Sequence, residues 1–321
     1  MRNWRVTVLG ASGFIGRSIV KRLAAQGAVI AAVSRHASAA RYLRPMGDVG
    51  QIALVDADLG NDAALAAVLA GANAVVNTVA ILYERGRQTF DALHHRLPAR
   101  LGALAKSAGV KHLVHLSAIG ADPASPAAYG RSKAAGEEAL RAAFPEAVIL
   151  RPSVVFGPDD AFFNRFAALA RVSPALPLIG GGTTRFQPVY VGDVADAVLA
   201  ALEREDAAGR IFELGGPEVF TFRQLMELLL REIGRKRLLL PVPFPLAALE
   251  ALWLERLPYP PVTRDQLRML RRDCVVTPGA SGFAELGITP TAVELVLPFY
   301  LERFRRGGRP VGGAPHIVAM P

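Results

Sequence analysis

The chain has 321 residues, 51% of them hydrophobic, which is enough for a full hydrophobic core in one large domain or two closely associated ones. A single cysteine, Cys274, excludes an internal disulfide framework, and the apolar runs fall short of a membrane-spanning helix. The formal net charge of +9 favours an anionic partner, but no nucleic-acid-binding or metal-binding motif accompanies it, so we expect neither nucleic acid nor metal.

Strand-like and helix-like segments alternate through the first half of the chain. The expected strands are residues 4–9, 28–33, 51–56, 74–79, 113–117 and 147–151, with helices that include residues 17–23, 62–69 and 98–108. This alternation is typical of an α/β protein with helices on both faces of a parallel sheet. We therefore predict a Rossmann-type doubly wound parallel sheet, with residues 1–151 as the nucleotide-binding core.

Prolines, glycines and short helical segments dominate after residue 151. They predict a small C-terminal lobe over residues 152–308, interleaved with the sheet, to which the segment 210–216 returns one strand. Residues 309–321 are rich in glycine and proline, without periodicity, and we expect a flexible tail there.

Three glycines, Gly10, Gly13 and Gly16, follow the first strand and precede a helical segment. In this setting Gly10 permits a tight turn, Gly13 permits close approach of a pyrophosphate, and Gly16 permits close packing of helix on strand. The pyrophosphate would bind the free N–H groups of the helix, with Ser12 beside it. The G-x-x-G-x-x-G spacing indicates the short-chain dehydrogenase/reductase group.

The second strand ends in Ser34 and Arg35, without a carboxylate. An acidic residue at this place pairs with the ribose hydroxyls of NAD, whereas arginine accommodates the 2′-phosphate of NADP. Arg35 therefore favours NADPH, with Ser34 as an additional donor, and the alternative is an ordinary surface arginine. Asp58, just after the third strand, suits the adenine amino group or the cap of the next helix.

The second group of candidate residues is Ser117, Tyr129 and Lys133. The Y-x-x-x-K spacing puts the phenol and the ammonium on one helical face. In a reductase, tyrosine exchanges a proton with the substrate oxygen, lysine lowers the tyrosine pKa and holds the ribose, and serine orients the carbonyl. The alternative is a tyrosine and a lysine that are merely exposed.

With these motifs the chain resembles an extended or atypical short-chain dehydrogenase/reductase. The segments 151–158 and 187–195 resemble two further signatures of that group, the first of which passes under the nicotinamide. From this resemblance we also expect nucleotide contacts from Phe14, Ile15, Leu59, Thr78, Val79, Ala80, Pro152 and Val154.

Four later segments, residues 144–153, 162–166, 263–265 and 286–288, resemble the NAD(P)H-binding accessory subunit of respiratory complex I, the NADH:ubiquinone oxidoreductase. This resemblance implies a subunit that holds NADPH tightly without turning it over and contacts other complex I subunits. It implies a peripheral position on the cytoplasmic face of the bacterial inner membrane, or on the matrix side in an organelle. We expect no secretory signal at the polar start of the chain.

Two other functions stay open. The retained Ser117, Tyr129 and Lys133 fit a free-standing NADP-dependent epimerase, dehydratase or reductase, so catalytic activity is undecided at this point. The other open function is a regulator that senses NADPH without catalysing a reaction.

The apolar segment 238–257 bears on the partners. Its first prolines exclude a regular helix, but Pro245 can begin one, with Leu246, Leu249, Trp253 and Leu257 on a single stripe. The stripe packs on its own domain, or on a partner subunit or the lipid surface. Nearby arginines could then meet anionic lipid headgroups.

Overall fold

The computed structural model describes residues 1–308; the tail expected at 309–321 lies outside the described residues. The chain forms two compact units. The first comprises residues 1–152, 191–214 and 276–290, and the second comprises residues 153–190, 215–275 and those from 291 onward. Each unit is therefore built from segments that are far apart in the sequence.

A seven-stranded sheet forms the centre of the first unit. Its strands are β1 (Arg5–Leu9), β2 (Val29–Ser34), β3 (Ile52–Asp56), β4 (Ala74–Asn77), β5 (His112–Leu116), β6 (Val148–Pro152) and β11 (Ile211–Leu214). The order is β11-β6-β5-β4-β1-β2-β3, and every pairing is parallel. This confirms the predicted Rossmann-type sheet, including the late strand that joins its edge.

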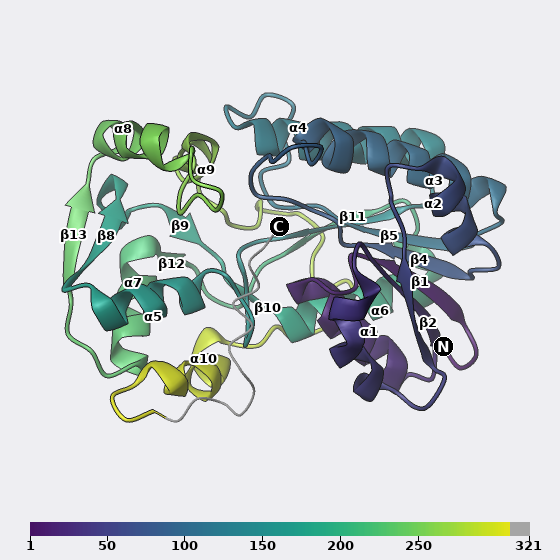
Figure 1. Ribbon diagram of the computed structural model, residues 1–321, viewed down its shortest axis with the longest axis horizontal. Helices are drawn as coiled ribbons and strands as arrows, with labels where there is room; N and C mark the ends of the chain where they lie inside the picture. Colours follow the sequence, from purple (N-terminus) through teal and green to yellow (C-terminus); the bar gives the residue numbers. More distant parts are fainter. Residues whose placement is uncertain (309–321) are drawn as a thin grey trace. The chain divides into compact units, whose positions relative to one another are not determined.

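Helices cover both faces of this sheet (Figure 1). They are α1 (Phe14–Ala25), α2 (Asp62–Leu69), α3 (Leu97–Ser107), α4 (Ala128–Ala143) and α6 (Val191–Glu203), with shorter helical segments η1 (Ala37–Met46), η2 (Asp91–Arg96) and η4 (Glu205–Ala207). Helix α1 packs on α6 along one face, and α3 packs on α2 and α4 along the other. The central strands are nearly continuous apolar runs because they are buried on both sides.

Strand order reverses between β1 and β4, which are neighbours in the sheet. Ligands of open α/β sheets bind at such a reversal, outside the carboxyl ends of the strands. The glycine loop follows β1, and Asn77 ends β4 at the same edge. The topology thus places the candidate site at this edge.

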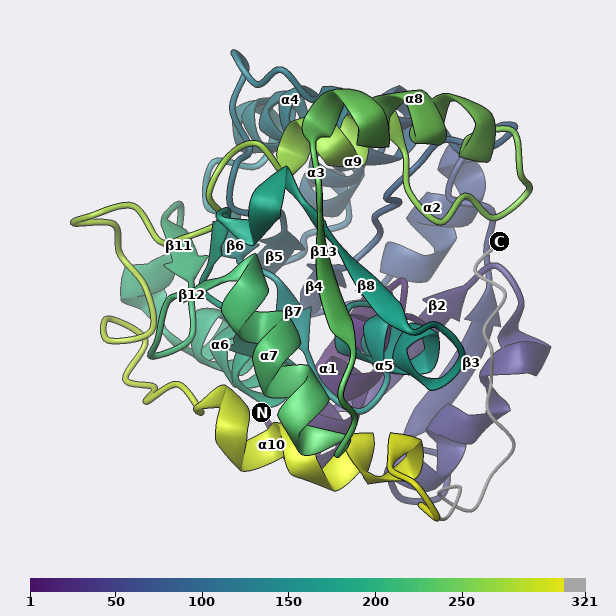
Figure 2. The ribbon, with the colours of Figure 1, turned by 90° about the vertical axis from the view of Figure 1, so that its left-hand side faces the viewer.

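The second unit has its own aromatic and aliphatic core. Its elements are β7 (Val155–Phe156), α5 (Phe163–Val172), β8 (Ala175–Ile179), η3 (Gly180–Gly182), β9 (Arg185–Phe186), β10 (Val189–Tyr190), β12 (Phe220–Thr221), α7 (Phe222–Glu232), β13 (Leu238–Val242), α8 (Phe244–Leu254), α9 (Arg264–Met269), α10 (Val293–Leu301) and η5 (Glu302–Phe304). Figure 2 shows β8 beside β13, with α7 beside α10. Buried phenylalanines, among them Phe156, Phe163 and Phe222, fill the space between these elements.

Helix α8 begins after Pro243 and carries Pro245 in its first turn, as predicted, but it ends at Leu254, three residues earlier than the periodic stripe. Only Ala247 and Ala251 of this helix are buried, and both pack near α9. The predicted stripe is exposed: Leu246, Leu249, Trp253 and Leu257 are 49%, 58%, 64% and 49% accessible. Packing on its own domain is therefore wrong for this stripe.

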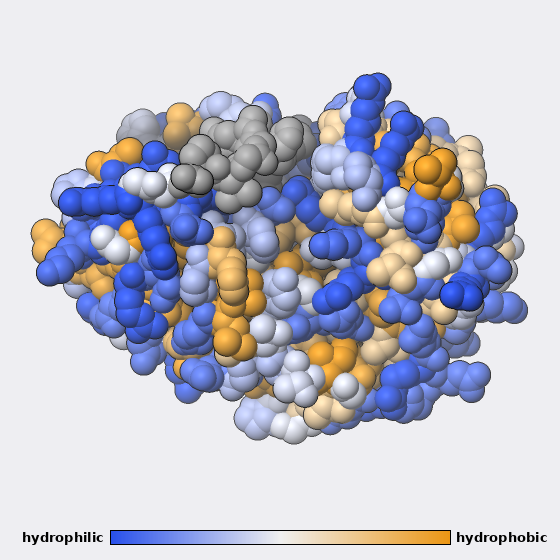
Figure 3. Space-filling model, turned by 90° about the horizontal axis from the view of Figure 1, so that it is seen from below, coloured by the Kyte–Doolittle hydropathy of each residue, from blue (hydrophilic) through white to orange (hydrophobic). Residues whose placement is uncertain are grey.

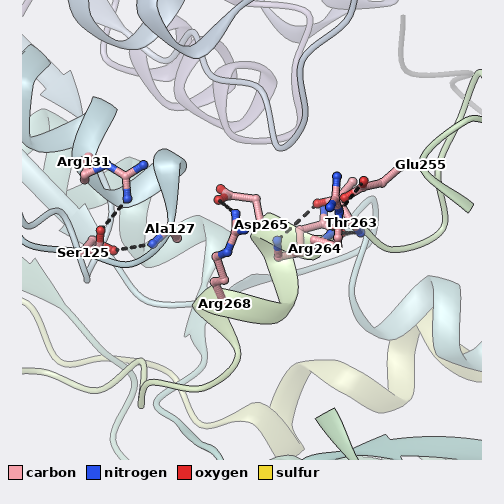
Figure 4. Close-up of polar contacts among 9 residues, drawn as sticks. Ser125, Ala127, Arg131, Glu255, Thr263, Arg264, Asp265 and Arg268 are labelled. Carbon is pink, nitrogen blue, oxygen red and sulfur yellow. Dashed lines mark hydrogen bonds and ion pairs between the residues drawn. The ribbon is translucent and has the colours of Figure 1, made fainter. Parts of the chain in front are cut away.

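The loop between α8 and α9 is held by polar contacts (Figure 4). Thr263 caps α9 and forms a reciprocal capping box with Gln266. Arg264 pairs with Glu255 at 2.9 Å, and Asp265 lies 3.5 Å from Arg268. The Thr-Arg-Asp sequence noted above thus fixes the start of α9 and ties it to the end of α8.

Hydrophobic side chains are also exposed on α10, where Leu295 and Phe299 are 65% and 79% accessible. On the face drawn in Figure 3, such side chains form separate groups among hydrophilic ones. Within residues 1–308, no helix combines the length and the apolar character that a membrane crossing requires.

Close packing of α4 on η2 predicts that Gly136→Ala destabilises the protein. An added Cβ would lie 1.7 Å from the carbonyl oxygen of His94, so backbone must move. Overpacking of this kind costs about 1–3 kcal/mol, which urea unfolding measures. The exposed Glu138→Ala on the same helix is the control and should change the free energy of unfolding by less than about 0.5 kcal/mol. Equal values for the two variants would contradict the close packing.

Candidate nucleotide-binding site

The glycine loop begins directly at the end of β1. The amides of Gly10 and Ala11 both donate to the carbonyl of Val33 at 3.1 Å, which fixes the loop beside β2. Gly10 has φ +77°, a left-handed conformation that favours glycine. A Cβ on Gly16 would lie only 2.2 Å from the carbonyl oxygen of Gly10. Glycine at both positions is therefore required for α1 to start so close to the strand.

The outer side of the loop is open. Gly13 is the exposed N-cap of α1, and an added Cβ would meet only the Gly10 carbonyl, at 3.2 Å. The first N–H groups of a helix have no acceptor within it, and here Phe14 and Ile15 contribute them beside the half-buried Ser12. Such a helix start fits a pyrophosphate without any rearrangement.

The end of β2 offers donors for a further anion. The Ser34 side chain is buried, and its Oγ has no hydrogen-bond partner among the described residues. Arg35 follows it and is exposed. The nearby carboxylate of Asp56 is engaged, because it accepts from the amide of Ala37 at 2.5 Å. The end of β2 therefore offers a buried hydroxyl and an exposed cation to a ligand.

The predicted residues after β3 and β4 are also located in the first unit. The Thr78 hydroxyl donates to the carbonyl of Leu9 at 2.8 Å, so it joins the end of β4 to the end of β1, where the glycine loop begins. Val79 is half-buried and Ala80 is exposed. The exposed Asp58 accepts from Gly60, while Leu59 beside it is half-buried.

A helix-capping role for Asp58 is wrong. The N-cap of α2 is Asn61, whose side chain accepts from the amides of Ala63 and Ala64. The cap thus falls three residues later than the sequence suggested.

Tyr129 and Lys133 lie one turn apart on α4, as predicted. The Lys133 ammonium is buried and donates to the carbonyl of Leu116 at 3.0 Å. Burial lowers the pKa of Lys133 to about 8, since the charged form loses hydration. The Tyr129 ring is buried and lies nearly perpendicular to the rings of Phe90 and His94. The Lys133 side chain is thus held at the end of β5, and the Tyr129 ring packs on two aromatic rings.

The start of α4 is fixed by two further sets of bonds. Arg131 donates to the carbonyl of Ser125 at 2.6 Å, and the Ser125 hydroxyl accepts from the amide of Ala127 (Figure 4). On the other side, Ser132 donates to the carbonyl of Tyr129 at 2.8 Å. These contacts orient the first turn of the helix that carries Tyr129.

His94 completes this arrangement. Its Nε2 accepts from the amide of Ile81 at 3.0 Å, so in the neutral ring the proton is on Nδ1, which faces the Ser132 hydroxyl at 3.0 Å. Burial lowers the pKa of His94 to about 2, and the charge of Lys133 adds to this effect. The imidazole therefore stays neutral and links η2 to α4.

A second buried histidine, His115, lies on β5. The Asn77 carbonyl oxygen accepts from Val79, so its amide nitrogen donates to His115 Nδ1 at 3.0 Å. The proton of the neutral ring is then on Nε2, which has no partner among the described residues. Burial, with a smaller effect of Lys133, lowers the pKa of His115 to about 3.

The Ser117 hydroxyl donates to the carboxylate of Glu137 rather than to Tyr129. Glu137 lies four residues after Lys133 on α4. Glu137 is buried and pairs with Arg151 of β6 at 2.6 Å. The same guanidinium lies 3.5 Å from Glu213 of β11. These bonds raise the pKa of Arg151, chiefly through the hydrogen bond to Glu137. Ser117 is thus the end of a buried ionic network.

Two predicted residues flank the boundary between the units. Pro152 ends β6 in the first unit, and its carbonyl accepts from Ile119 at 3.0 Å. Val154 belongs to the second unit, where its carbonyl accepts from Val189. No sequence motif marks His94, although it lies on a helical segment that precedes the Tyr129 helix. Glu137 is likewise outside the motifs, and its i+4 spacing from Lys133 is the signal that the sequence offers for it.

The glycine loop lies at the reversal point of a parallel sheet, and a tyrosine–lysine pair lies on the helix after the fifth strand. Together these two features define a nucleotide-binding protein of the short-chain dehydrogenase/reductase type. Residues 6–215 match the NAD dependent epimerase/dehydratase family, and the chain belongs to this family.

Curated relatives resemble nearly the whole chain. NADH dehydrogenase [ubiquinone] 1 alpha subcomplex subunit 9, mitochondrial, of Arabidopsis thaliana is 36% identical over 314 residues, which cover 94% of this chain and 78% of that protein. Its counterpart of the same name in Mus musculus is 33% identical, with 93% and 80% covered. Among solved structures, a dTDP-glucose 4,6-dehydratase from Streptomyces venezuelae has the same fold, with a TM-score of 0.74, 21% identity and 94% and 96% covered.

The two buried neutral histidines predict a loss of stability in mild acid. Unfolding returns His94 and His115 to a pKa of 6.5, so between pH 6.5 and about 3 the unfolded chain binds more protons than the folded one. The free energy of unfolding should then fall by up to ~2.7 kcal/mol per pH unit. Urea unfolding at pH 7 and pH 5 measures this slope.

His115→Phe should reduce that pH dependence by about half, since one of the two protons is no longer taken up. The exposed His36→Ala is the control and should leave the slope unchanged. An unaltered slope in His115→Phe would mean that His115 does not stay neutral in the fold.

Proposed function

We propose that this protein is an NADPH-binding accessory subunit of a proton-pumping NADH:quinone oxidoreductase, and that the nucleotide is held without turnover. Two relatives that span most of the chain are named as subunits of NADH dehydrogenase. The open glycine loop and the unpartnered Ser34 hydroxyl support a resident nucleotide. A nucleotide at a hundred times its Kd would add about 2.7 kcal/mol to the stability of the fold.

The bond from Ser117 to Glu137 carries the non-catalytic part of this proposal. A serine that activates a carbonyl must donate its only proton to the substrate. Here that proton goes to the carboxylate of Glu137, which is paired with Arg151. Breaking the bond would remove one of the donors that a buried carboxylate uses, so Ser117 is poorly suited to orient a carbonyl.

Tyr129 and Lys133 have another role under this proposal. The Lys133 ammonium has two N–H donors besides the one on Leu116, and with the Tyr129 hydroxyl these would hold the nicotinamide ribose.

Arg35 and Ser34 would select NADPH. The exposed guanidinium and the unpartnered hydroxyl would together hold the 2′-phosphate. The pyrophosphate would bind Gly13, Phe14 and the rest of the helix start. NADPH bound there supplies a hydride in active relatives of the fold; here the residues bind and orient it only.

The exposed apolar stripe of α8 is the proposed contact surface for other complex I subunits, with anionic lipid headgroups beside it. Leu249 and Trp253 are the most exposed members of the stripe, and arginines follow in and after α9. Exposed apolar side chains near cations suit an interface at a membrane surface. We place the protein peripherally on the cytoplasmic face of a bacterial inner membrane, or on the matrix side in an organelle.

The second candidate is a free-standing NADP-dependent epimerase, dehydratase or reductase. The family match and the retained Tyr129 and Lys133 favour it. In that case Tyr129 would transfer the proton, and the positive charge of Lys133, one turn along the same helix, would stabilise the tyrosinate form. Ser117 would have to leave Glu137 during the reaction.

Mild detergent extraction of native membranes, size separation and mass spectrometry test the two functions. An accessory subunit should migrate with complex I subunits and carry NADPH, and Tyr129→Phe should keep both, with nucleotide affinity lowered only a few-fold by the lost ribose contact. Ser117→Ala serves as the matched variant. A small soluble species whose turnover disappears in Tyr129→Phe would establish the enzyme instead.

Arg35→Asp should weaken NADPH at least about tenfold and NADH much less, because only NADPH carries the 2′-phosphate that a carboxylate repels. Isothermal titration of both nucleotides measures the two affinities. Arg41→Asp, an equally exposed position in η1, controls for charge reversal alone. Equal losses for both nucleotides would contradict the phosphate role of Arg35.

A further inference from the structure

Two side chains that no motif singled out lie against the carbonyl groups of the glycine loop. Arg17 of α1 donates through Nε to Gly13 and through Nη2 to Ser12, both at 3.3 Å. Tyr42 of η1 donates through its hydroxyl to the same Ser12 carbonyl, at 2.6 Å. The Arg17 guanidinium also lies over the Tyr42 ring, 5.0 Å from its centroid. Arginine and tyrosine thus form a stacked pair bound to the loop.

This stacked pair and the end of β2 lie on the same part of the sheet edge. The carbonyl of Val33 accepts from Gly10 and Ala11, so Ser34 and Arg35 emerge directly beside the loop. Segment η1 begins two residues after Arg35 and returns to the loop through Tyr42.

The Ser34 hydroxyl supplies an independent indication of a ligand. It is buried and has no hydrogen-bond partner among residues 1–308. A buried hydroxyl of this kind is rare unless a water or a ligand satisfies it.

We propose that Arg17 is a second arginine of the 2′-phosphate site, and that Tyr42 is the residue that positions it. The inference rests on the proposed binding of NADPH. It assigns the recognition of the phosphomonoester to two guanidinium groups and one hydroxyl, those of Arg17, Arg35 and Ser34.

The charge of the ligand explains why one arginine is insufficient. A phosphomonoester carries between one and two negative charges near neutral pH, and its three outer oxygens accept several hydrogen bonds. Arg35 is exposed and must be ordered when the nucleotide binds. Arg17 is already ordered by the Tyr42 ring and by two carbonyl groups, so its positive charge is fixed beside the glycine loop before the nucleotide binds.

The test compares Kd values for NADPH and NADH in the full-length protein. Arg17→Met keeps an unbranched stem on the Tyr42 ring but removes the guanidinium. NADPH affinity should fall roughly tenfold or more, while NADH affinity should stay within about threefold. Lys21→Met removes one positive charge from an exposed turn of the same helix and should leave the ratio of the two Kd values unchanged.

Tyr42→Phe isolates the positioning role, since it keeps the ring and removes the bond to Ser12. It should reduce the preference for NADPH by a few-fold, with the melting temperature of the nucleotide-free protein nearly unchanged. Arg17→Lys keeps the charge without the planar fork and should give a partial loss, which also covers the case in which Arg17→Met does not fold.

The outcomes separate this inference from the proposed function. If the wild-type protein binds NADH as tightly as NADPH, the proposed cofactor is wrong. If the wild type prefers NADPH and Arg17→Met keeps that preference, only the inference on Arg17 is wrong. Equal losses for both nucleotides would likewise overturn it, because they would assign Arg17 to the pyrophosphate or to the loop alone.

Discussion

The first unit depends on the ion pair between the buried Glu137 and the partly buried Arg151. A carboxylate in an apolar interior requires a partner, and removal of one member of such a pair costs about 3–5 kcal/mol. Here the pair joins α4 to the sheet, with Ser117 bound on one side and Glu213 on the other. The helix that carries Tyr129 and Lys133 is therefore fixed by charge as well as by packing. The same network also engages the hydroxyl of Ser117 through Glu137.

Much of the fold could be predicted because a parallel sheet buried on both faces leaves continuous apolar runs in the sequence. The strand around residues 74–79 was visible for this reason, as was the late strand near 211–214. The helix ends were harder: Asn61, not Asp58, caps α2, since either residue type suits that position and only tertiary packing decides between them.

The site was predictable where its parts are adjacent in sequence and hidden where they are not. The glycine loop lies within seven residues, and Tyr129 and Lys133 are one helical turn apart, so local geometry identifies them. The partner of Ser117 is twenty residues away, and Tyr42 approaches Ser12 across thirty. Spacing in the sequence carries no information on such contacts, because the fold of the intervening segment determines them.

Interleaving of the chain has a consequence for biosynthesis. Strand β6 is completed at residue 152, but its outer partner β11 is made only at residues 211–214, and Glu213 is bonded in turn by the amide of Thr277. Until then the nascent chain has an unpaired, apolar strand at the edge of its sheet. Arg151 on that strand has only Glu137 of its two carboxylate partners. Such an edge pairs readily with other chains. The ribosome-bound chain thus carries this open edge while residues 153–214 are synthesised, which is the interval in which a chaperone would protect it.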